Sequence, residues 1–426
     1  MEGSVFSKYS WIDFAFSVVG VCTFLVDWGS DVWVATEFYC RGDFLWFAVL
    51  VGLMVLSSFV VQMFSWFWFK YDRELPGFNA SPSGGGTVLF GDRVKLFCLL
   101  HVLQLGFFFR HISAIRQGFR VWWRKEEGSE YAVYLTHDLS MLRLIETFCE
   151  SAPQLTLMIY VMLRTNKARA VQFVSIAAST TSMAWMVVDY HRSLRSFLPD
   201  KAKQGWSSSL IYFLWNLLLI APRVATLALF SSVLPGYIAV HFLLLWPVFV
   251  LWAWRQKTEF MDSVGGEWLY RATIGLIWYF SWFNVAEGQT RARSLIYHAF
   301  ITTDAGLLVV TWWSYRDPIQ TESYALALVI ALPLTYLLGL LFKSLYYCCF
   351  HPKLWRPPVR DPGLPDDLPD AQVSIRDMSV QDGTPSLTTF SQLLNKRMAC
   401  HASLFYLEQR VVRKTDNTNR AESSHL

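Results

Sequence analysis

Charged residues are scarce in this sequence: they make up 16% of its 426 residues, while 54% are hydrophobic and 17% aromatic. Soluble domains carry roughly 25% charged residues, so the deficit argues against a soluble globular protein and indicates contact with lipid. The net charge is only +4 and lies mostly in loops and in the C-terminal tail. This distribution suits a membrane surface better than a nucleic acid, and we expect no nucleic-acid partner.

Motifs of catalysis and metal binding are also missing. The seven cysteines form no CxxC pair and the scattered histidines form no HExxH, so we expect no disulfide framework, no metal site and no cofactor. The glycine-rich run 84–91 is followed by Asp92 and Arg93 rather than by Lys-Ser/Thr, which excludes a P-loop. No GxSxG nucleophile elbow is present. The sequence therefore predicts a protein that is not an enzyme.

Ten apolar segments follow one another along the chain, and we expect eight of them to cross the membrane. Segments 94–110 and 269–286 carry basic residues on both flanks, a pattern that the positive-inside rule opposes for a full crossing. We expect these two to be re-entrant, half-inserted helices surrounded by protein. The expected spans are 11–34, 44–69, 135–163, 171–188, 207–232, 237–254, 294–315 and 324–347.

This order predicts an all-α integral membrane protein with two tandem structural repeats, 1–200 and 201–350, since each holds four spans and one re-entrant helix. Eight spans place both termini on one side, and the basic tail indicates that this side is the cytoplasm. In the tail 351–426, the Pro- and Asp-rich stretch 352–385 is expected to be disordered. Apolar residues at near-helical spacing then predict an amphipathic helix over 388–412.

Ionisable residues inside the expected spans are the most informative feature. Three aspartates of the first span fall within about 40° of one another on a helix and form one acidic stripe. In span 135–163, four polar side chains share an arc of about 80°. The candidate buried polar residues are Asp13, Asp27, Asp31, Asp138, Arg143, Glu146, Glu150, Gln154, Asp189, Arg192, Asn216, Arg223 and Asp304.

The free-energy cost of these charges limits what they can do. One charge at the centre of a membrane helix costs roughly 2.5–3.5 kcal/mol, so nine of them would cost about 25–30 kcal/mol if unpaired. A typical net stability is only roughly 5–15 kcal/mol. The groups must therefore pair, become protonated or line a hydrated path. Ion-pair clasps between helices are one reading, but seven carboxylates against two arginines favour a polar groove through the bilayer.

Several strings of residues resemble the XK-related family. They are Glu146-Thr-Phe-Cys-Glu150-Ser-Ala-Pro-Gln154-Leu-Thr-Leu, Tyr212-Phe-Leu-Trp-Asn216 with Pro222-Arg223, Tyr279-Phe-Ser-Trp-Phe-Asn284-Val-Ala-Glu287-Gly, Asp27-Trp-Gly-Ser-Asp31 and Asp189-Tyr-His-Arg192. The resemblance covers about 10–350 and implies eight spans with two partly inserted helices. It also implies energy-independent and poorly selective exchange of phospholipids between the leaflets of the plasma membrane, which exposes phosphatidylserine in apoptosis. The buried polar residues would then form the path for lipid headgroups.

The resemblance further implies a switch in the tail, because apoptotic members of the family are activated when a caspase removes a C-terminal helix. Asp367-Leu-Pro-Asp370 followed by Ala371 fits the caspase preference for aspartate at both ends of a tetrapeptide. Asp382-Gly383 is a second choice, since Ser379 replaces the preferred first aspartate. Activation by phosphorylation and constitutive activity remain alternatives.

Three further expectations concern single residues and partners. Trp46 matches a proposed gating tryptophan of the family, although an interfacial aromatic-belt position explains it better on sequence alone. Cys348 and Cys349 follow the last span and are candidates for palmitoylation, with two adjacent buried cysteines without function as an equal alternative. Close relatives pair with a single-span immunoglobulin-type glycoprotein, so a similar subunit is an expected partner beside membrane phospholipids.

Two other functions use the same buried charges. A carrier or channel for solutes or ions would enclose the charged path between helices. A non-transporting docking subunit would need the charges only for folding or trafficking. A path that opens sideways to lipid distinguishes a scramblase from a carrier.

Overall fold

The computed structural model describes residues 9–72, 97–124, 129–165, 170–198, 203–261, 263–285 and 290–351, and all of its regular elements are helices. The expectation of an all-helical chain is thus confirmed for this part of the protein. The elements are α1 (Trp11–Cys40), α2 (Phe44–Asp72), α5 (Gly106–Trp123), α6 (Ser129–Cys149), α7 (Ser151–Thr165), α8 (Ala170–Phe197), α9 (Trp206–Val233), α10 (Tyr237–Arg255), α11 (Val264–Phe280), α12 (Thr290–Tyr315), α13 (Pro318–Thr321), α14 (Ala325–Leu345) and the π-helix η1 (Tyr346–Phe350).

Six helices in the described part of the chain are long and apolar enough to cross a membrane: α1, α2, α9, α10, α12 and α14 continued by η1. This supports a multi-pass membrane protein, while the count of eight spans remains a prediction. The remaining two expected spans correspond to α6 with α7 and to α8. The side chains of α6 from Ala132 to Ile145 are almost all buried. A helix enclosed by protein needs no apolar surface towards lipid, which explains its many polar residues.

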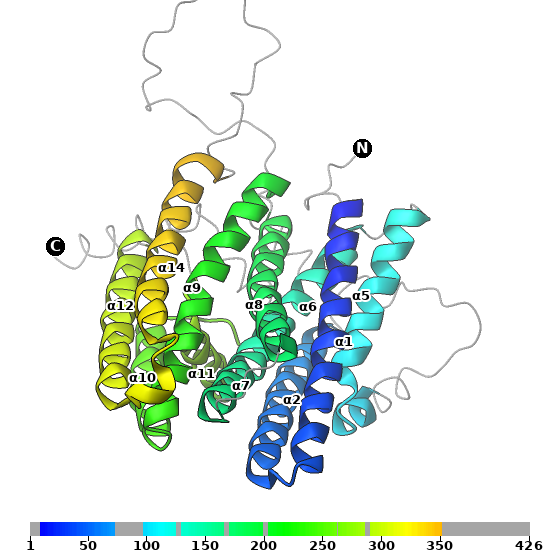
Figure 1. The fold of residues 1–426 in the computed structure, drawn as a ribbon. Helices are drawn as coiled ribbons and strands as arrows, with labels where there is room; N and C mark the ends of the chain where they lie inside the picture. The colour runs from blue at the N-terminus through cyan, green and yellow to red at the C-terminus, as the bar shows by residue number, and fades with distance from the viewer. Residues whose placement is uncertain are drawn as a thin grey trace, which may run out of the picture.

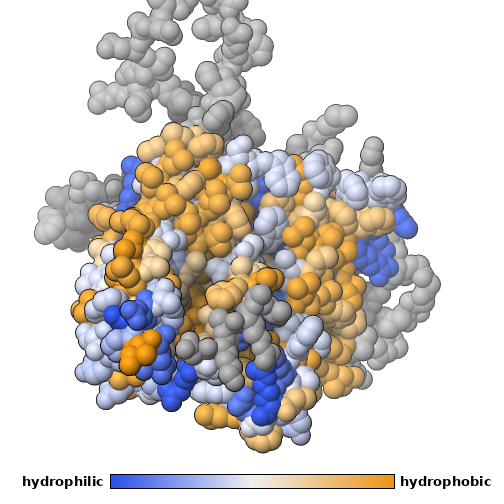
Figure 2. All heavy atoms as spheres, in the orientation of Figure 1, coloured by the Kyte–Doolittle hydropathy of each residue, from blue (hydrophilic) through white to orange (hydrophobic). Residues whose placement is uncertain are grey.

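The helices form one bundle with α6 near its centre. Figure 1 shows α1, α2 and α5 on one side and α9, α10, α12 and α14 on the other, with α6, α7 and α8 between them. The central helix α6 packs against α2, α5, α7, α8 and α11. The start of α1 and the end of η1 lie at the same end of the bundle (Figure 1). On the face drawn in Figure 2, hydrophobic side chains cover much of the surface, as expected for helices that face lipid.

The first of the two segments predicted to be re-entrant, 94–110, is interrupted by a turn. In the described part of 94–110, a helix over 97–102 ends in a turn, and α5 then begins at Gly106. Gln104 in this turn has a φ of 61°, a conformation that few residues other than glycine adopt. The turn is held to α2, since Gln62 Nε2 donates to the Gln104 carbonyl at 2.9 Å and Ser58 Oγ donates to Gln104 Oε1 at 2.8 Å.

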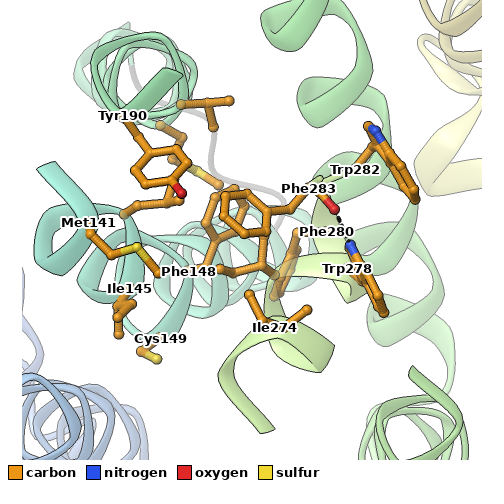
Figure 3. Packing of buried hydrophobic residues seen from close by; sticks show 14 of the residues in the cluster. Met141, Ile145, Phe148, Cys149, Tyr190, Ile274, Trp278, Phe280, Trp282 and Phe283 are labelled. Carbon is orange, nitrogen blue, oxygen red and sulfur yellow. Dashed lines mark hydrogen bonds between the residues drawn. The ribbon is translucent and has the colours of Figure 1, made fainter. Parts of the chain in front are cut away.

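The second such segment, α11 and the residues after it, joins the two halves of the chain. Figure 3 shows its aromatic residues packed against Phe148 of α6 and Tyr190 of α8. Trp278 Nε1 donates to the carbonyl of Phe283 at 2.7 Å and so closes the chain after α11 (Figure 3). This aromatic core fixes α6, and with it the polar residues of α6, relative to the second half of the molecule.

Close packing of α14 on α9 depends on a glycine. A methyl group added at Gly339 would lie 2.7 Å from Leu219 Cδ2 and 3.1 Å from the backbone carbon of Leu218. Small residues at such positions let membrane helices approach each other closely.

We therefore expect Gly339→Ala to lower the stability of the protein by about 1–3 kcal/mol, the usual range for overpacking. Thermal unfolding of the purified protein in detergent measures this effect. Gly306→Ala on α12 is the matched control, because a methyl group there meets nothing within 4 Å. Equal unfolding temperatures for the two variants would contradict the close contact between α9 and α14.

Candidate functional site

The acidic stripe of α1 meets different partners at three levels. Asp13 and Asp31 are buried and Asp27 is half-buried. At a rise of 1.5 Å per residue, the stripe from Asp13 to Asp31 extends over about 27 Å, close to the thickness of roughly 30 Å of the hydrocarbon layer. One face of α1 thus carries acidic groups near both ends of this length, with Gly20 and Phe24 on the same face between them.

Cations neutralise the first level. Lys203 Nζ donates to Asp13 Oδ2 at 2.8 Å, and a guanidinium nitrogen of Arg192 lies 3.7 Å from Asp13 Oδ1. Arg192 also donates to the carbonyl of Gln204 at 2.7 Å and lies over the Phe16 ring at 4.1 Å. Asp13 additionally accepts the backbone N–H of Ser10 at 2.9 Å, which caps the start of α1. This level is a clasp between α1, α8 and the segment before α9.

The second level is a buried ion pair between α6 and α8. Arg143 donates to Asp189, and both side chains are almost completely buried. The Arg143 guanidinium lies directly against Gly20 of α1, where an added methyl group would overlap it. Only a residue without a side chain leaves room for this pair beside α1.

The third level is a group of acids that the ion pairs leave out. Ser151 Oγ donates to Asp27 at 2.6 Å, and the Gln154 amide, oriented to satisfy both groups, donates to the two oxygens of Asp31 at 2.7 and 2.9 Å. Glu146 lies within electrostatic range of Glu150, Asp27 and Asp31. We call Asp27, Asp31, Glu146 and Glu150 the acid cluster.

A break between two helices lies beside the acid cluster. The single span expected at 135–163 is divided at Glu150, where α6 ends and α7 begins. Pro153 explains the break, because it lacks the N–H that would bond to the Cys149 carbonyl in a continuous helix. Glu150 lies at this break and Ser151 and Gln154 follow it, where Ser151 and Gln154 bond to the carboxylates of α1.

No cation pairs with the acid cluster in the described part of the chain: none of the ion pairs found there involves its four carboxylates. Arg143 is in electrostatic range of Glu146 but already binds Asp189. Buried carboxylates without a counter-charge are costly, so the cluster must attract protons, water or a cation from outside.

Two connected cavities lie beside the acid cluster. A cavity of about 320 Å³ is lined by Glu146 and Glu150 together with residues of α1, α2 and the 97–108 region. A groove of about 1040 Å³ between α1 and α2 adjoins it, since both are lined by Trp28, Met54, Ser58 and Gln104. Trp28 in the groove is 55% exposed and Phe59 is 54% exposed, so the groove opens on the outer surface of the bundle.

The remaining candidate residues lie elsewhere. Arg223 donates to Asp304 and to the carbonyl of Tyr279, and His241 contacts Asp304 at 2.9 Å. These residues clasp α9, α10, α11 and α12 in the second half and do not meet the acid cluster. Asn216 donates to the carbonyl of Tyr212 within its own helix.

Of the other predicted residues, the structure places Trp46 and the two adjacent cysteines, whereas the tail residues lie outside its described part. Trp46 packs edge to face on Tyr160 at 5.2 Å and lines an apolar cavity of about 470 Å³ between the two halves. Cys348 and Cys349 are exposed in η1. The candidate cleavage residues Asp370, Ala371, Asp382 and Gly383, and the helix expected at 388–412, lie outside the described residues.

Sequence reasoning missed a polar network between α2, α5 and α6. Arg110 donates to Asp72 at 2.8 Å and to Ser65 Oγ at 2.7 Å, and it lies 3.7 Å from Asp138. Tyr134 Oη donates to Asp72 at 2.6 Å. Arg110 is the last residue of the apolar segment 94–110, and this position was a signal of burial. A second missed group is Lys343, whose ammonium contacts Ser294 and His298 inside the bundle.

The sequence is similar to known proteins over most of its length. Residues 15–352 match the model of the XK-related protein family. XK-related protein 8 of Gasterosteus aculeatus is 78% identical over 409 residues, which cover 96% of this chain and 100% of the relative. XK-related protein 8 of Tetraodon nigroviridis is 76% identical over 406 residues, covering 95% and 99%. XK-related protein 8 of Pan troglodytes is 44% identical over 355 residues, covering 81% and 86%.

The contact between Gly20 and Arg143 gives a direct test of the site's geometry. We expect Gly20→Ala to displace the guanidinium from Asp189 and to lower stability by about 3–5 kcal/mol, the range for a broken buried ion pair. Thermal unfolding in detergent measures the change. Gly29→Ala in the same helix is the control, since a methyl group there meets nothing within 4 Å. A Gly20→Ala protein as stable as the control would rule out this close packing.

Proposed function

Because this chain belongs to the XK-related family, we propose that it is an energy-independent phospholipid scramblase that exposes phosphatidylserine at the surface of the plasma membrane. The observation that carries the proposal is the acid cluster beside cavities that open sideways between α1 and α2. A lipid headgroup can enter polar surroundings through such an opening while its acyl chains stay among the neighbouring lipids. In this proposal the protein couples to no energy source and catalyses no covalent step.

The polar stripe of α1 supplies the length that such a path needs. The stripe from Asp13 to Asp31 extends over about 27 Å, close to the thickness of the hydrocarbon layer, and its first and third levels carry the polar groups proposed to meet a headgroup that has left water. The levels differ in charge, since Lys203 and Arg192 surround Asp13 whereas the acid cluster has no paired cation. In the proposal a zwitterionic headgroup meets the two levels one after the other: its phosphate is attracted near Lys203 and Arg192, and its ammonium group near the acid cluster.

Trp46 is the proposed gate. Its ring packs on Tyr160 of α7 and borders the apolar cavity that Pro153 and Leu157 also line. Because α7 also carries Gln154, which holds Asp31, a movement of Trp46 can be transmitted through α7 to the polar stripe. In the proposal this contact separates the apolar cavity from the acid cluster in the resting protein.

Activation is assigned to the C-terminal tail. Cleavage by a caspase after Asp370, or with second preference after Asp382, would release the expected helix 388–412 from the cytoplasmic face. Both termini are proposed to be cytoplasmic, in agreement with the position of the start of α1 and the end of η1 at one end of the bundle. A single-span immunoglobulin-type glycoprotein remains the proposed partner for delivery to the cell surface.

A carrier for solutes or ions is the alternative that uses the same charges. It requires a path enclosed by helices, whereas the groove beside the acid cluster is lined by exposed residues such as Trp28 and Phe59. This sideways opening favours the scramblase. A docking subunit without transport stays the second alternative, and the following experiment separates it from both.

Phosphatidylserine exposure in cells that lack endogenous scramblases tests the proposal. The full-length chain is compared with a chain that ends at Asp370, after surface delivery of both has been verified. We expect annexin binding to appear with the truncated chain and to stay near background with the intact chain, because the tail acts as the brake.

A second variant tests the acid cluster: the truncated chain with Glu150→Gln keeps the size of the side chain but removes a carboxylate of the cluster. The truncated chain without this substitution is its control. We expect the Glu150→Gln chain to reach the surface and to show reduced annexin binding. Absence of annexin binding from all chains, although they reach the surface, would overturn the scramblase proposal and favour the docking subunit.

A further inference from the structure

The C-terminal half of α5 carries basic side chains on its outer surface. Arg116, Arg120 and Arg124 follow one another at four-residue spacing, which places them on one side of the helix. Arg116 and Arg124 are exposed and Arg120 is half-buried. Figure 1 shows α5 at the edge of the bundle, beside α1. We call Arg116, Arg120 and Arg124 the arginine face.

Contacts with α2 place the arginine face near the surface of the membrane. The helix α2 is long and apolar enough to cross the membrane, and it ends at Asp72. Arg110, earlier in α5, already donates to Asp72 at 2.8 Å. At a rise of 1.5 Å per residue, Arg116 lies about 9 Å further along α5. The arginine face therefore begins near the level at which α2 leaves the hydrocarbon layer.

Exposed aromatic rings beside the arginine face also indicate the membrane interface. Phe119, Trp122 and Trp123 are 40%, 37% and 66% exposed. Tryptophan rings collect at the level of the lipid headgroups, where one edge is apolar and the other meets water. Earlier in the helix, Phe109 and Ile112 are exposed as well, as expected for a surface that faces acyl chains. The outer surface of α5 thus changes from apolar to aromatic and basic along its length.

Arg116 and Arg120 have no counter-charge in the described part of the chain, where neither side chain forms an ion pair or a hydrogen bond. The helix dipole favours a cation in the last turn, where Arg120 lies, but it acts little on Arg116, about two turns from the end of α5. Arg116 instead follows the exposed Ile112 by one turn and precedes the exposed Phe119. An arginine among lipid-facing apolar residues is stabilised by an anion from the lipid side.

The guanidinium groups and their spacing indicate the kind of anion. The planar guanidinium fork binds two oxygens of one phosphate, so arginine is suited to phosphate recognition. Arg116 and Arg124 are eight residues apart, which corresponds to about 12 Å along the helix. A headgroup with a single phosphodiester offers one phosphate to this length of helix. A headgroup with several phosphates can engage two or more of the arginines at once.

We propose that the arginine face binds the headgroup of an inositol phospholipid that carries two or more phosphate groups on its ring. The lipid would lie in the leaflet at the end of the bundle where α1 begins, which is the side proposed to be cytoplasmic. The inference goes beyond scrambling, because it concerns a lipid that stays bound at the membrane surface rather than one that crosses the bilayer. Clusters of basic residues on amphipathic helices bind such lipids electrostatically.

The proposed site is in contact with the start of α1. The Trp122 ring stacks on Phe14 with 4.9 Å between the ring centroids. A methyl group added at Gly118 would lie 2.5 Å from Tyr9 Oη, so α5 and the residues around the start of α1 are closely packed here. A lipid that binds only the folded protein stabilises this packing, and its binding therefore raises the unfolding temperature.

Native mass spectrometry of the purified full-length protein in detergent tests the proposal, because it counts bound lipid molecules. The protein is titrated with phosphatidylinositol bisphosphate, phosphatidylinositol and phosphatidylserine of equal acyl chains, and with free inositol trisphosphate. We expect one molecule of the bisphosphate lipid to bind at concentrations about tenfold lower than the other two lipids. Additional charge-assisted hydrogen bonds to phosphate are the reason. Free inositol trisphosphate is expected to bind more weakly, since it lacks the acyl chains that face α5.

Variants of the arginine face locate the site. Arg116→Gln and Arg120→Gln are each expected to weaken binding of the bisphosphate lipid about tenfold. Arg116→Lys keeps the charge without the planar fork, and its affinity is expected to lie between those of Arg116→Gln and the unchanged protein. Arg164→Gln, which removes an exposed arginine at the end of α7, is the matched control and is expected to bind normally.

Thermal unfolding supplies a second readout. The bisphosphate lipid is expected to raise the unfolding temperature of the unchanged protein and of the Arg164→Gln control, but not that of a protein with both Arg116→Gln and Arg120→Gln. Equal unfolding temperatures without lipid show that the variants fold, as expected for substitutions at the helix surface.

Equal affinity of the unchanged protein and the double variant for the bisphosphate lipid would overturn the proposal. Binding of phosphatidylserine or phosphatidylinositol at the same concentrations would also overturn it, because the ring phosphates would then contribute nothing. Free inositol trisphosphate that binds as tightly as the lipid would assign the arginine face to soluble phosphates and contradict the lipid assignment. The scramblase proposal is tested separately by annexin binding, so the two failures are distinguishable.

Discussion

The cost of burying ionisable groups in a membrane governs how this molecule is built. Arg143 and Asp189 illustrate the constraint: each is almost completely buried, they satisfy each other, and Gly20 makes room for them. Because α6 carries Arg143 together with Asp138 and Glu146, it needs protein rather than lipid on every side. The packing of α2, α5, α7, α8 and α11 around α6 meets this need.

The acid cluster is an exception, because its carboxylates have no paired cation in the described part of the chain. Other buried charges form ion pairs, as Arg110 does with Asp72 and Arg223 with Asp304. At the break between α6 and α7, however, carboxylates from two parts of the chain approach each other without a paired cation, beside cavities that reach the surface. A structure built only for stability would neutralise this cluster, so we attribute its charge to the passage of a polar ligand.

The sequence predicted local features well and distant partners poorly. The spacing of Asp13, Asp27 and Asp31 placed them correctly on one face of α1, because helical geometry is local. Their partners Lys203, Ser151 and Gln154 are more than 120 positions away and follow only from the tertiary packing. Two further features of the structure could have been predicted from the sequence. Pro153 marked the break in the span expected at 135–163, and Arg110 lay at the end of an apolar segment.

A hydrated path that opens to lipid between α1 and α2 is the central claim, and water access to Ser58 tests it most directly. Ser58 lines both connected cavities. With Ser58→Cys protein in vesicles, the reaction of the introduced thiol with a charged thiol reagent would be followed by mass spectrometry. Exposed Cys40 and buried Cys149 serve as internal references. A hydrated path predicts a rate near that of Cys40, and a rate as slow as that of Cys149 would contradict it.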